Sequence, residues 1–566
     1  MSKNNRKSAL APLRAVATGV SGLDAVLGGG LPEYSFNLIA GSPGTGKTTL
    51  AQQIVFANAT VKRPALYFTV LGEPTLKMLR YQQQYEFFDR KLVGSAVQFL
   101  NLSEEVVDKN LSAVLDRMVL EVERAKPGII VVDSFRTISV PGGSDQSTGA
   151  LSLDQFVQGL SLHLTSWEVT SLLIGEYAEQ EQRNPVFTVA DGVFWLTQVT
   201  DRNSVVRKMQ VMKMRGRATM PGLHTFRMTD NGLQVFPRIP QQEFDRRPQS
   251  TRRLHTGVPG LDEIMGGGIP EGDALILAGP AGSGKTTFAT QFIAEGIRNN
   301  EPGIIVVFEE YPEEYVARAN EKNDNIEATI ATGKLKIIYL RPLDLSVDET
   351  LAEILDGVHE IGAQRVVIDS LSGFEVALAP TFREDFRESL YRLVGALTAT
   401  GVTVFMTVET TGSHSDMGFT TERVSFITDD IIVQRFVEIA GELRRVLAVV
   451  KMRGSEHSHE FRTFEVTAKG AVIGEPLKNY HGIITGVPEL RPSLPRLAHS
   501  GMTEQEGAVL DMLVRMGNAT DEMLAARLGV TAVEAAGALQ RLGTLGYVSP
   551  TRKGASTYRA VAQVGG

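Results

Sequence analysis

The fold of this chain is decided by Gly279-Pro280-Ala281-Gly282-Ser283-Gly284-Lys285-Thr286-Thr287, and nearly the same text stands earlier at Gly41-Ser42-Pro43-Gly44-Thr45-Gly46-Lys47-Thr48-Thr49. Both stretches follow the pattern G-x-x-x-x-G-K-T, with an apolar run before it and a helical pattern after it. In such a loop the backbone N–H groups turn toward phosphate oxygens, the lysine reaches the outer phosphates, and the threonine hydroxyl holds a magnesium ion. The positive end of the following helix adds to the attraction. Two matches in equivalent frames therefore predict two nucleotide-phosphate sites.

The composition is that of an ordinary soluble globular protein, with 566 residues and a net charge of -8. The chain has no cysteine, which excludes disulfides, thiolate chemistry and cysteine–zinc sites. No apolar run is long enough to cross a membrane, and the basic start of the chain lacks the apolar core of a signal peptide. We therefore expect a cytoplasmic protein without membrane contact, whose residues 1–14 form a disordered tail.

The spacing of matching residues indicates that a whole domain is duplicated. Lys47 and Lys285 are 238 residues apart, and Lys213 and Lys451 are separated by the same 238 residues. Strand and helix patterns alternate in each copy, and the strands are continuously apolar, which predicts an α/β fold with a mostly parallel sheet covered by helices on both faces. The expected organisation is repeat 1 at 15–237, a linker at 238–254, repeat 2 at 255–483, a second linker at 484–500 and a small module at 501–566.

Each repeat has an acidic residue at the end of an apolar strand. Asp133 ends Ile-Ile-Val-Val-Asp, and Asp369 ends Arg-Val-Val-Ile-Asp. In a unit that also holds a phosphate loop, such an acid polarises the magnesium shell beside the phosphates. The alternative interpretation is a cap for the next helix. We expect Thr48 with Asp133, and Thr286 with Asp369, to hold magnesium.

Hydrolysis needs a group that orients or deprotonates the attacking water, and Glu309-Glu310 stand where a strand of repeat 2 ends. The next acids, Glu313 and Glu314, follow Pro312 and are explained by the first turn of a helix. In repeat 1 the matching positions are Leu71 and Gly72, with Glu73 displaced by one residue. We therefore expect the first site to bind nucleotide and to hydrolyse it slowly or not at all.

Lys-Met-Arg-Gly recurs near the end of each repeat, and an arginine precedes each lysine by six residues. An even spacing on an antiparallel strand predicts that the arginine and the lysine share a face. Their charges are interpreted as part of the same site, as a finger inserted into a neighbour's site, or as plain surface charge. The cations concerned are Arg207, Lys213, Arg215, Arg445, Lys451 and Arg453.

Together these motifs resemble the KaiC-like ATPases of the RecA superfamily over roughly residues 15–482. The resemblance implies two tandem RecA-like domains and ATP with Mg²⁺ bound between the protomers of a ring, usually a hexamer. It further implies that Lys451, Arg453 and Arg445 reach the neighbour's phosphates, and that repeat 2 phosphorylates itself near the subunit interface. The sequence segments on which the resemblance rests include Thr256-Gly257-Val258, Phe308-Glu309-Glu310-Tyr311-Pro312, Ile427-Thr428-Asp429 and Lys451-Met452-Arg453-Gly454-Ser455.

The autokinase site of the clock proteins in that family is a Ser-Thr pair. Here Ser425 matches the serine, whereas Phe426 replaces the threonine. A two-step phosphorylation cycle is therefore not expected. Ser425 is interpreted either as a single phosphorylation site or as a buried serine of a strand. Phosphate at Ser425 would add nearly two negative charges at a protomer interface, enough to change the geometry of that interface or the affinity for a partner.

Residues 502–560 resemble a winged helix-turn-helix, with capping boxes at Thr503 and Thr531 and a terminal hairpin. The expected recognition helix offers only Gln540 and Arg541 against Glu534, so DNA binding is possible but less favoured than protein docking or dimerisation. The motifs predict an ATPase, and the resemblance implies that it is a ring-forming regulatory protein with serine autokinase activity in repeat 2. The alternatives are a DNA-acting recombination or repair ATPase and a nucleotide-assembled scaffold with little hydrolysis.

Overall fold

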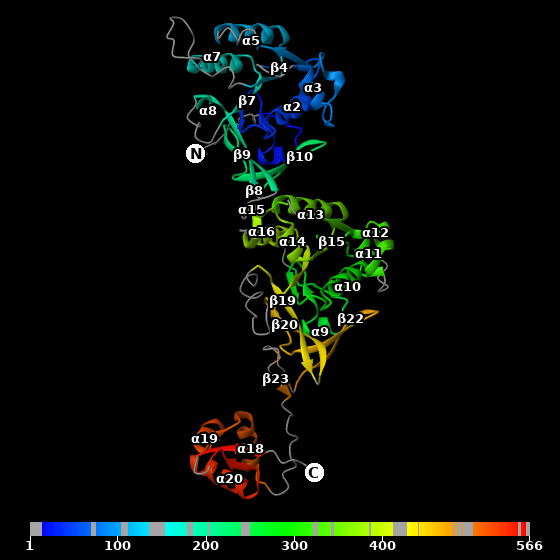
Figure 1. Ribbon diagram of the computed structural model, residues 1–566, viewed down its shortest axis with the longest axis vertical. Helices are drawn as coiled ribbons and strands as arrows, with labels where there is room; N and C mark the ends of the chain where they lie inside the picture. The colour runs from blue at the N-terminus through cyan, green and yellow to red at the C-terminus, as the bar shows by residue number, and fades with distance from the viewer. Residues whose placement is uncertain are drawn as a thin grey trace, which may run out of the picture. The chain divides into compact units, whose positions relative to one another are not determined.

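A computed structural model places the chain in two compact units, Met1–Lys478 with Gly482–Pro488 and Asn479–His481 with Glu489–Gly566. The first unit contains both repeats, and the second contains the C-terminal module (Figure 1). The structure describes residues 14–69, 75–103, 111–134, 153–177, 185–201, 204–238, 250–320, 326–340, 345–383, 386–410, 427–439, 441–478, 480–481, 483, 489–490, 502–552 and 556–561.

Repeat 1 is built on a sheet whose described strands follow the order β11-β10-β9-β8-β3-β7-β6-β4-β5. The strands from β8 to β5 in this order run parallel, and β9, β10 and β11 are added as antiparallel strands. The strands are β3 (Phe36–Gly41), β4 (Ala65–Thr69), β5 (Val97–Asn101), β6 (Ile129–Asp133), β7 (Thr170–Glu176), β8 (Gly192–Asp201), β9 (Ser204–Met214), β10 (Leu223–Thr229) and β11 (Gly232–Phe236).

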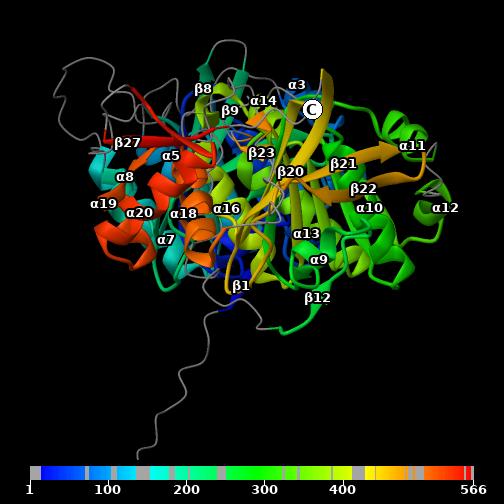
Figure 2. The same cartoon turned by 90° about the horizontal axis from the view of Figure 1, so that it is seen from below.

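Repeat 2 has the same arrangement, with the strand order β16-β15-β17-β18-β14-β19-β20-β21-β22. The antiparallel strands β20, β21 and β22 can be followed in Figure 2. The two sheets make the chain a tandem of RecA-like domains. The strands of repeat 2 are β14 (Ala274–Gly279), β15 (Gly303–Val307), β16 (Leu335–Tyr339), β17 (Arg365–Asp369), β18 (Thr403–Glu409), β19 (Asp430–Ile439), β20 (Glu442–Met452), β21 (Arg462–Thr467) and β22 (Gly470–Pro476).

Helices cover both faces of each sheet, because the parallel strands are apolar on both sides. In repeat 1 the main helices are α2 (Lys47–Asn58), α3 (Thr75–Gln82), α5 (Leu111–Ala125) and α7 (Leu153–Ser166). In repeat 2 they are α10 (Lys285–Arg298), α11 (Pro312–Asn320), α12 (Ile326–Ala331), α13 (Val347–Ile361), α14 (Leu371–Ala377) and α16 (Phe386–Ala399). Shorter elements are β1 (Ala15–Val16), α1 (Leu23–Val26), β2 (Leu31–Pro32), η1 (Arg90–Leu92), α8 (Pro185–Val189), β12 (Arg253–Leu254), α9 (Leu261–Ile264), β13 (Ile269–Pro270) and α15 (Pro380–Arg383).

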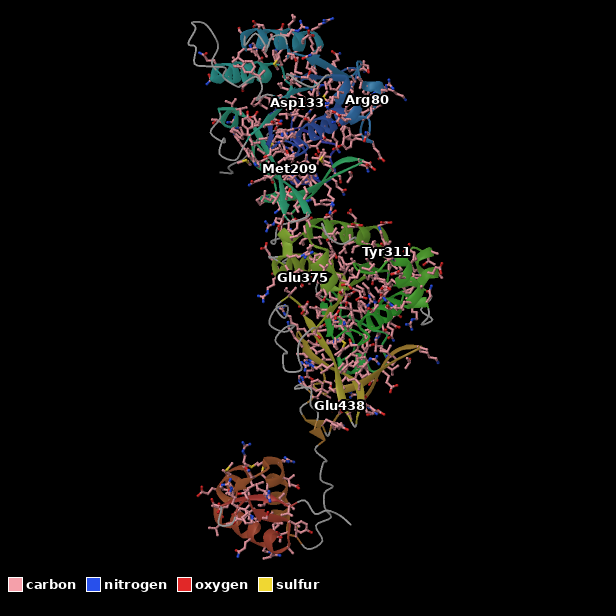
Figure 3. All side chains as sticks on the ribbon, viewed as in Figure 1. Arg80, Asp133, Met209, Tyr311, Glu375 and Glu438 are labelled. Atoms are coloured by element: carbon pink, nitrogen blue, oxygen red, sulfur yellow. The ribbon has the colours of Figure 1, made fainter. Side chains whose placement is uncertain are left out.

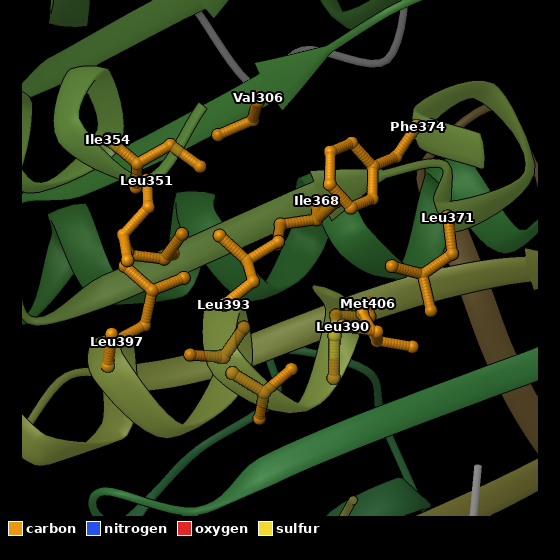
Figure 4. Packing of buried hydrophobic residues seen from close by; sticks show 14 of the residues in the cluster. Val306, Leu351, Ile354, Ile368, Leu371, Phe374, Leu390, Leu393, Leu397 and Met406 are labelled. Carbon is orange, nitrogen blue, oxygen red and sulfur yellow. The ribbon is translucent and has the colours of Figure 1, made fainter. Parts of the chain in front are cut away.

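The core of repeat 2 has two layers, one on each face of the sheet. On one face α13 and α16 pack against alternate residues of β15, β17 and β18, as Figure 4 shows for Leu351, Ile368, Leu393 and Met406. On the other face α10 packs through residues such as Phe292. Because side chains alternate along a strand, the helix that a given strand position faces can be read from its register.

Helix ends in repeat 2 are set by local hydrogen bonds. The side chain of Ser346 accepts a hydrogen bond of 3.1 Å from Glu349 N at the start of α13, and Gly362 ends that helix in the left-handed region at φ 62°. Pro312 and the acids after it form the first turn of α11, as the sequence predicts. These caps satisfy backbone groups that the helix itself leaves unpaired.

The described residues of the C-terminal unit form three helices, a three-stranded sheet of order β25-β27-β26 and a two-stranded sheet of β23 and β24. Both predicted capping boxes are present, Thr503 with Glu506 and Thr531 with Glu534. The element order agrees with the helices and hairpin predicted from sequence, while the winged-helix interpretation stays a prediction. The elements are β23 (Tyr480–His481), β24 (Glu489–Leu490), α18 (Glu504–Met516), β25 (Ala519–Thr520), α19 (Asp521–Leu528), α20 (Ala532–Thr544), β26 (Val548–Pro550) and β27 (Thr557–Ala560).

Candidate functional site

Each phosphate loop joins the end of a central strand to the start of a helix: β3 to α2 in repeat 1 and β14 to α10 in repeat 2. The loop glycines hold left-handed backbone, with φ 77° at Gly44, 92° at Gly46, 73° at Gly282 and 102° at Gly284. A side chain at such positions is strained. A Cβ on Gly284 would also lie 2.8 Å from Val466 Cγ2. The glycines are therefore required for the turn that points backbone N–H groups into the site.

The loop lysines fold back on the carbonyl groups of their own loops. Lys285 Nζ donates to Gly279 O and Pro280 O at 2.9 Å each, and Lys47 Nζ donates to Ser42 O at 2.7 Å. Burial lowers the pKa of both lysines, while nearby carboxylates act in the opposite direction. Lys47 is thus buried and Lys285 half-buried at the loop, where phosphate oxygens would satisfy the ammonium groups as well as the carbonyls do.

The predicted magnesium acid of repeat 1 is joined to the loop directly. Thr48 Oγ1 donates to Asp133 Oδ2 at 2.9 Å, and Tyr67 Oη donates to the same oxygen at 2.8 Å. Burial raises the pKa of Asp133, and these two hydrogen bonds oppose that rise. Asp133 is the last residue of β6 and is labelled in Figure 3. A hydroxyl and a carboxylate oxygen side by side fit a magnesium ion, which takes one or two protein oxygens together with phosphate oxygens and water.

In repeat 2, Asp369 ends β17 at the equivalent point. Its carboxylate accepts a hydrogen bond from the hydroxyl of Thr407, which lies on the neighbouring strand β18. Thr286 lies in the first turn of α10, as Thr48 does in α2. The second site therefore has the same two oxygen donors on the same two elements.

The two glutamates after β15, Glu309 and Glu310, have different surroundings. Glu310 is held by Arg318 of α11, with two nitrogen–oxygen distances of 2.7 Å. Glu309 is exposed and lies beside α14, since a Cβ on Gly373 would lie 2.8 Å from Glu309 Oε1. Glu309 is also among the carboxylates that act on the pKa of Lys285. Of the predicted pair, Glu309 is therefore the member turned toward the loop lysine. The matching residues Leu71, Gly72 and Glu73 lie outside the described part of the chain.

The expectation that arginine and lysine share a strand face is wrong in both repeats, because a β-bulge lies between them. In repeat 2 the partners shift from Val449↔Ile432 to Lys451↔Ile431, and the same shift separates Val211 from Lys213 in repeat 1. One extra residue reverses the faces that follow it. Arg445 and Arg207 thus lie on the faces of α10 and α2, and the lysines lie on the opposite faces.

The lysines and arginines of Lys-Met-Arg-Gly lie at the edge of the sheet opposite the loops. β19 begins at Asp430 beside Leu275, so Lys451 lies near the start of β14, whereas the loop follows the last residue of that strand. Lys451 donates to Thr428 O, and Arg453 pairs with Asp429 at 3.4 Å. In repeat 1, Lys213 donates to Thr188 O at 2.9 Å, and Arg215 pairs with Asp191 at 3.2 Å.

The two preceding arginines differ from each other. Arg445 Nη2 lies 3.4 Å from Gly282 O, in the phosphate loop of its own repeat. Arg207 lines a small cavity together with Val205, Thr225 and Arg227. Arg445 therefore lies at its own loop, whereas Lys451 and Arg453 lie at the far edge of the same sheet.

One acid in each repeat lies at the phosphate loop without having been predicted from the sequence. Glu176 ends β7 and Glu409 ends β18, and their register partners are Gly41 and Gly279, the first glycines of the two loops. The available signal was an acid directly after the buried strand 171–175 and again after the equivalent strand of repeat 2. Both side chains are exposed at the site.

The remaining predictions concern the phosphorylation site, the C-terminal unit and the membrane. Ser425 lies outside the described residues. In the C-terminal unit Arg541 pairs with Glu506 of α18 at 2.9 Å. Among the described helices, none combines the length and the apolar character needed to cross a membrane.

Comparison with known proteins gives the family. The family model for the ATPase KaiC matches residues 16–239 and again 254–478, one match for each repeat. Circadian clock oscillator protein KaiC of Thermostichus vulcanus is 27% identical over 512 residues, which cover 88% of this chain and 96% of that protein. The protein of the same name from Rippkaea orientalis (strain PCC 8801 / RF-1) is 29% identical over 491 residues, covering 84% of this chain and 92% of that protein. With two loops, two strand-end acids and this match over both repeats, the chain belongs to the KaiC family of ATPases.

Proposed function

We propose that this protein hydrolyses ATP with Mg²⁺ in repeat 2 and phosphorylates itself at Ser425, as a ring-forming regulator. The observation that carries the proposal is the hydrogen bond from the phosphate-loop residue Thr48 to the strand-end carboxylate of Asp133 in repeat 1. Repeat 2 has Thr286 and Asp369 at the equivalent places, in the first turn of α10 and at the end of β17. Thr286 and Asp369 hold the magnesium ion, which neutralises charge on the phosphates when bound. Glu309 orients the water or the serine hydroxyl.

A ring, with six protomers as the expected number, is favoured by the place of the Lys-Met-Arg-Gly cations. Lys451 is level with Ile276 in the first half of β14, because both pair with Ile431, whereas the loop of the same repeat follows Gly279 at the other end of that strand. Lys451 and Arg453 contact Thr428 and Asp429 rather than their own loop, so their proposed role is at a site on an adjacent protomer, as for an arginine finger. ATP bound at such a junction would stabilise the ring.

For repeat 1 we propose ATP binding with Mg²⁺ held by Thr48 and Asp133, in support of ring assembly. A regulatory protein is the proposed partner, and the C-terminal unit is a docking or dimerisation module. Arg541 is the main cation of α20 and forms an ion pair with Glu506. This pairing disfavours contacts between Arg541 and DNA bases.

The experiment is mass spectrometry of the full chain after incubation with ATP and Mg²⁺, in the unaltered protein, Glu309→Gln and Ser425→Ala. The expected result is one phosphate on the unaltered protein, located at Ser425, and none on either variant. ATP consumption without any phosphate would refute the autokinase and leave the ATPase. Absence of both ATP consumption and phosphate would favour the scaffold alternative.

A further inference from the structure

The two carboxylates at the ends of β7 and β18 occupy one position in the duplicated fold. Glu176 pairs in register with Gly41, and Glu409 pairs in register with Gly279. Neighbouring strands lie about 4.8 Å apart, so each acid starts directly beside the first residue of a phosphate loop. Its strand is inserted between the loop strand and the strand of the magnesium acid, with β7 between β3 and β6.

The alternation of side chains places both acids on the side of the sheet that carries the loop helix. Leu172 and Ile174 of β7 pack in the same core cluster as Leu50 and Ile54 of α2. Glu176, two residues after Ile174, therefore points to the face of α2, whose first residue is Lys47. Burial lowers the pKa of Lys47, and of the carboxylates that oppose this, Glu176 acts more strongly than Asp133.

Repeat 1 lacks the two glutamates that follow β15 in repeat 2, so a carboxylate from another strand would have to orient the water there. The positions that match Glu309 and Glu310 are Leu71 and Gly72, which have no group able to accept a proton. Asp133 already accepts hydrogen bonds from Thr48 and Tyr67, an arrangement that suits magnesium binding. Glu176 is exposed at the same edge of the sheet.

We infer that Glu176 is the water-orienting carboxylate of the first site, so that repeat 1 hydrolyses ATP although it lacks the glutamate pair. The water oxygen forms a bond to the γ-phosphorus, and the bond from that phosphorus to the bridging oxygen breaks, leaving its electron pair on ADP. One proton of the water passes to the Glu176 carboxylate and then to the released phosphate. Glu409 has the equivalent place in repeat 2, where Glu309 is also available. This inference extends the proposed function to a second hydrolytic site.

The test uses the full chain in a Glu309→Gln, Glu310→Gln background, which removes Glu309, the proposed water-orienting group of repeat 2, together with its neighbour Glu310. The part of the remaining ATPase rate that Lys47→Ala abolishes belongs to the first site. Glu176→Gln is expected to lower that part by at least about 100-fold, which is the lower range for loss of a general base. The amount of ATP bound per chain should stay unchanged with Glu176→Gln and fall with Lys47→Ala. In the Glu176→Gln variant, the nucleotide recovered from the first site should be ATP rather than ADP.

Glu123→Gln is the matched control, because Glu123 is an exposed glutamate on α5 of the same repeat, and it should change neither quantity. Glu176→Asp should retain part of the activity, since the carboxylate is kept. An unchanged first-site rate with Glu176→Gln overturns the inference, as does a background rate that Lys47→Ala does not lower. The proposed function is judged separately, by whether Glu309→Gln with Glu310→Gln lowers the total rate.

Discussion

Thr48 Oγ1 donates a hydrogen bond of 2.9 Å to Asp133 Oδ2, although the two residues are 85 positions apart in the sequence. The contact joins the first turn of α2 to the end of β6. It places two oxygen atoms, of the kind that a hard cation binds, beside the predicted phosphate loop.

The first prediction concerns this pair. Asp133→Asn keeps the shape of the side chain but removes its charge, so the magnesium-dependent part of ATP binding at the first site should weaken by about 10-fold or more. Equilibrium binding of ATP to a Lys285→Ala protein, with Mg²⁺ and with a chelator, measures it. Asp116→Asn on the exposed side of α5 is the control. Equal affinities for Asp133→Asn and the unaltered chain at saturating Mg²⁺ would show that Asp133 acts as a helix cap instead.

The second prediction separates the two glutamates after β15. Glu309→Gln should lower the ATPase rate of repeat 2 by about 100-fold or more, as loss of a water-orienting group does. Glu310→Gln should have a smaller effect, because Glu310 is held by Arg318 of α11. Steady-state rates in a Lys47→Ala background measure both, and Glu313→Gln in the first turn of α11 is the control. A larger loss with Glu310→Gln would reverse the assignment.

The third prediction tests whether Lys451 acts across a protomer boundary. Lys285→Ala and Lys451→Ala should each be inactive in repeat 2, the first for lack of phosphate binding and the second for lack of a cation at the neighbour's site. When the two variants are mixed and reassembled, some junctions combine an intact loop with an intact Lys451, so activity should return. Lys469→Ala, in the exposed turn before β22, should remain active alone. If mixing restores nothing, Lys451 is structural.

The fourth prediction is a pH dependence of stability. Asp430 is fully buried, and burial together with the nearby Asp273 and Asp429 raises its pKa to about 8. The Asp430 carboxyl therefore keeps its proton up to a higher pH in the folded chain than in the unfolded chain. This contribution to stability is fully present below about pH 4 and is lost as the pH rises to about 8.

Asp430→Asn cannot ionise, so its melting temperature should exceed that of the unaltered chain by several degrees near pH 8 and by less near pH 5. Calorimetry at fixed nucleotide concentration measures the difference, because bound ligand itself raises the melting temperature. A difference that is the same at both pH values would mean that Asp430 stays charged in the folded protein.

Some features followed from local sequence because their causes are local. The G-x-x-x-x-G-K-T pattern, the apolar strands and the capping boxes depend on residues that are close in the chain, and α11, α18 and α20 begin where the sequence predicts. The constant spacing between Lys47 and Lys285 likewise revealed the duplication, which the two sheets of identical strand order confirm.

Tertiary structure decided the relations that depend on strand order and register. Glu176 and Glu409 are far in sequence from the loops that they flank, and only the insertion of β7 and β18 beside β3 and β14 brings them there. The bulge before Lys451 reversed a face that even spacing predicts, because one unpaired residue shifts every later side chain. The order of residues along the chain sets which chemical groups the protein has and which local elements carry them. The pairing of distant strands decided which of those groups meet, because hydrogen bonds between backbones, and not spacing along the chain, set that register.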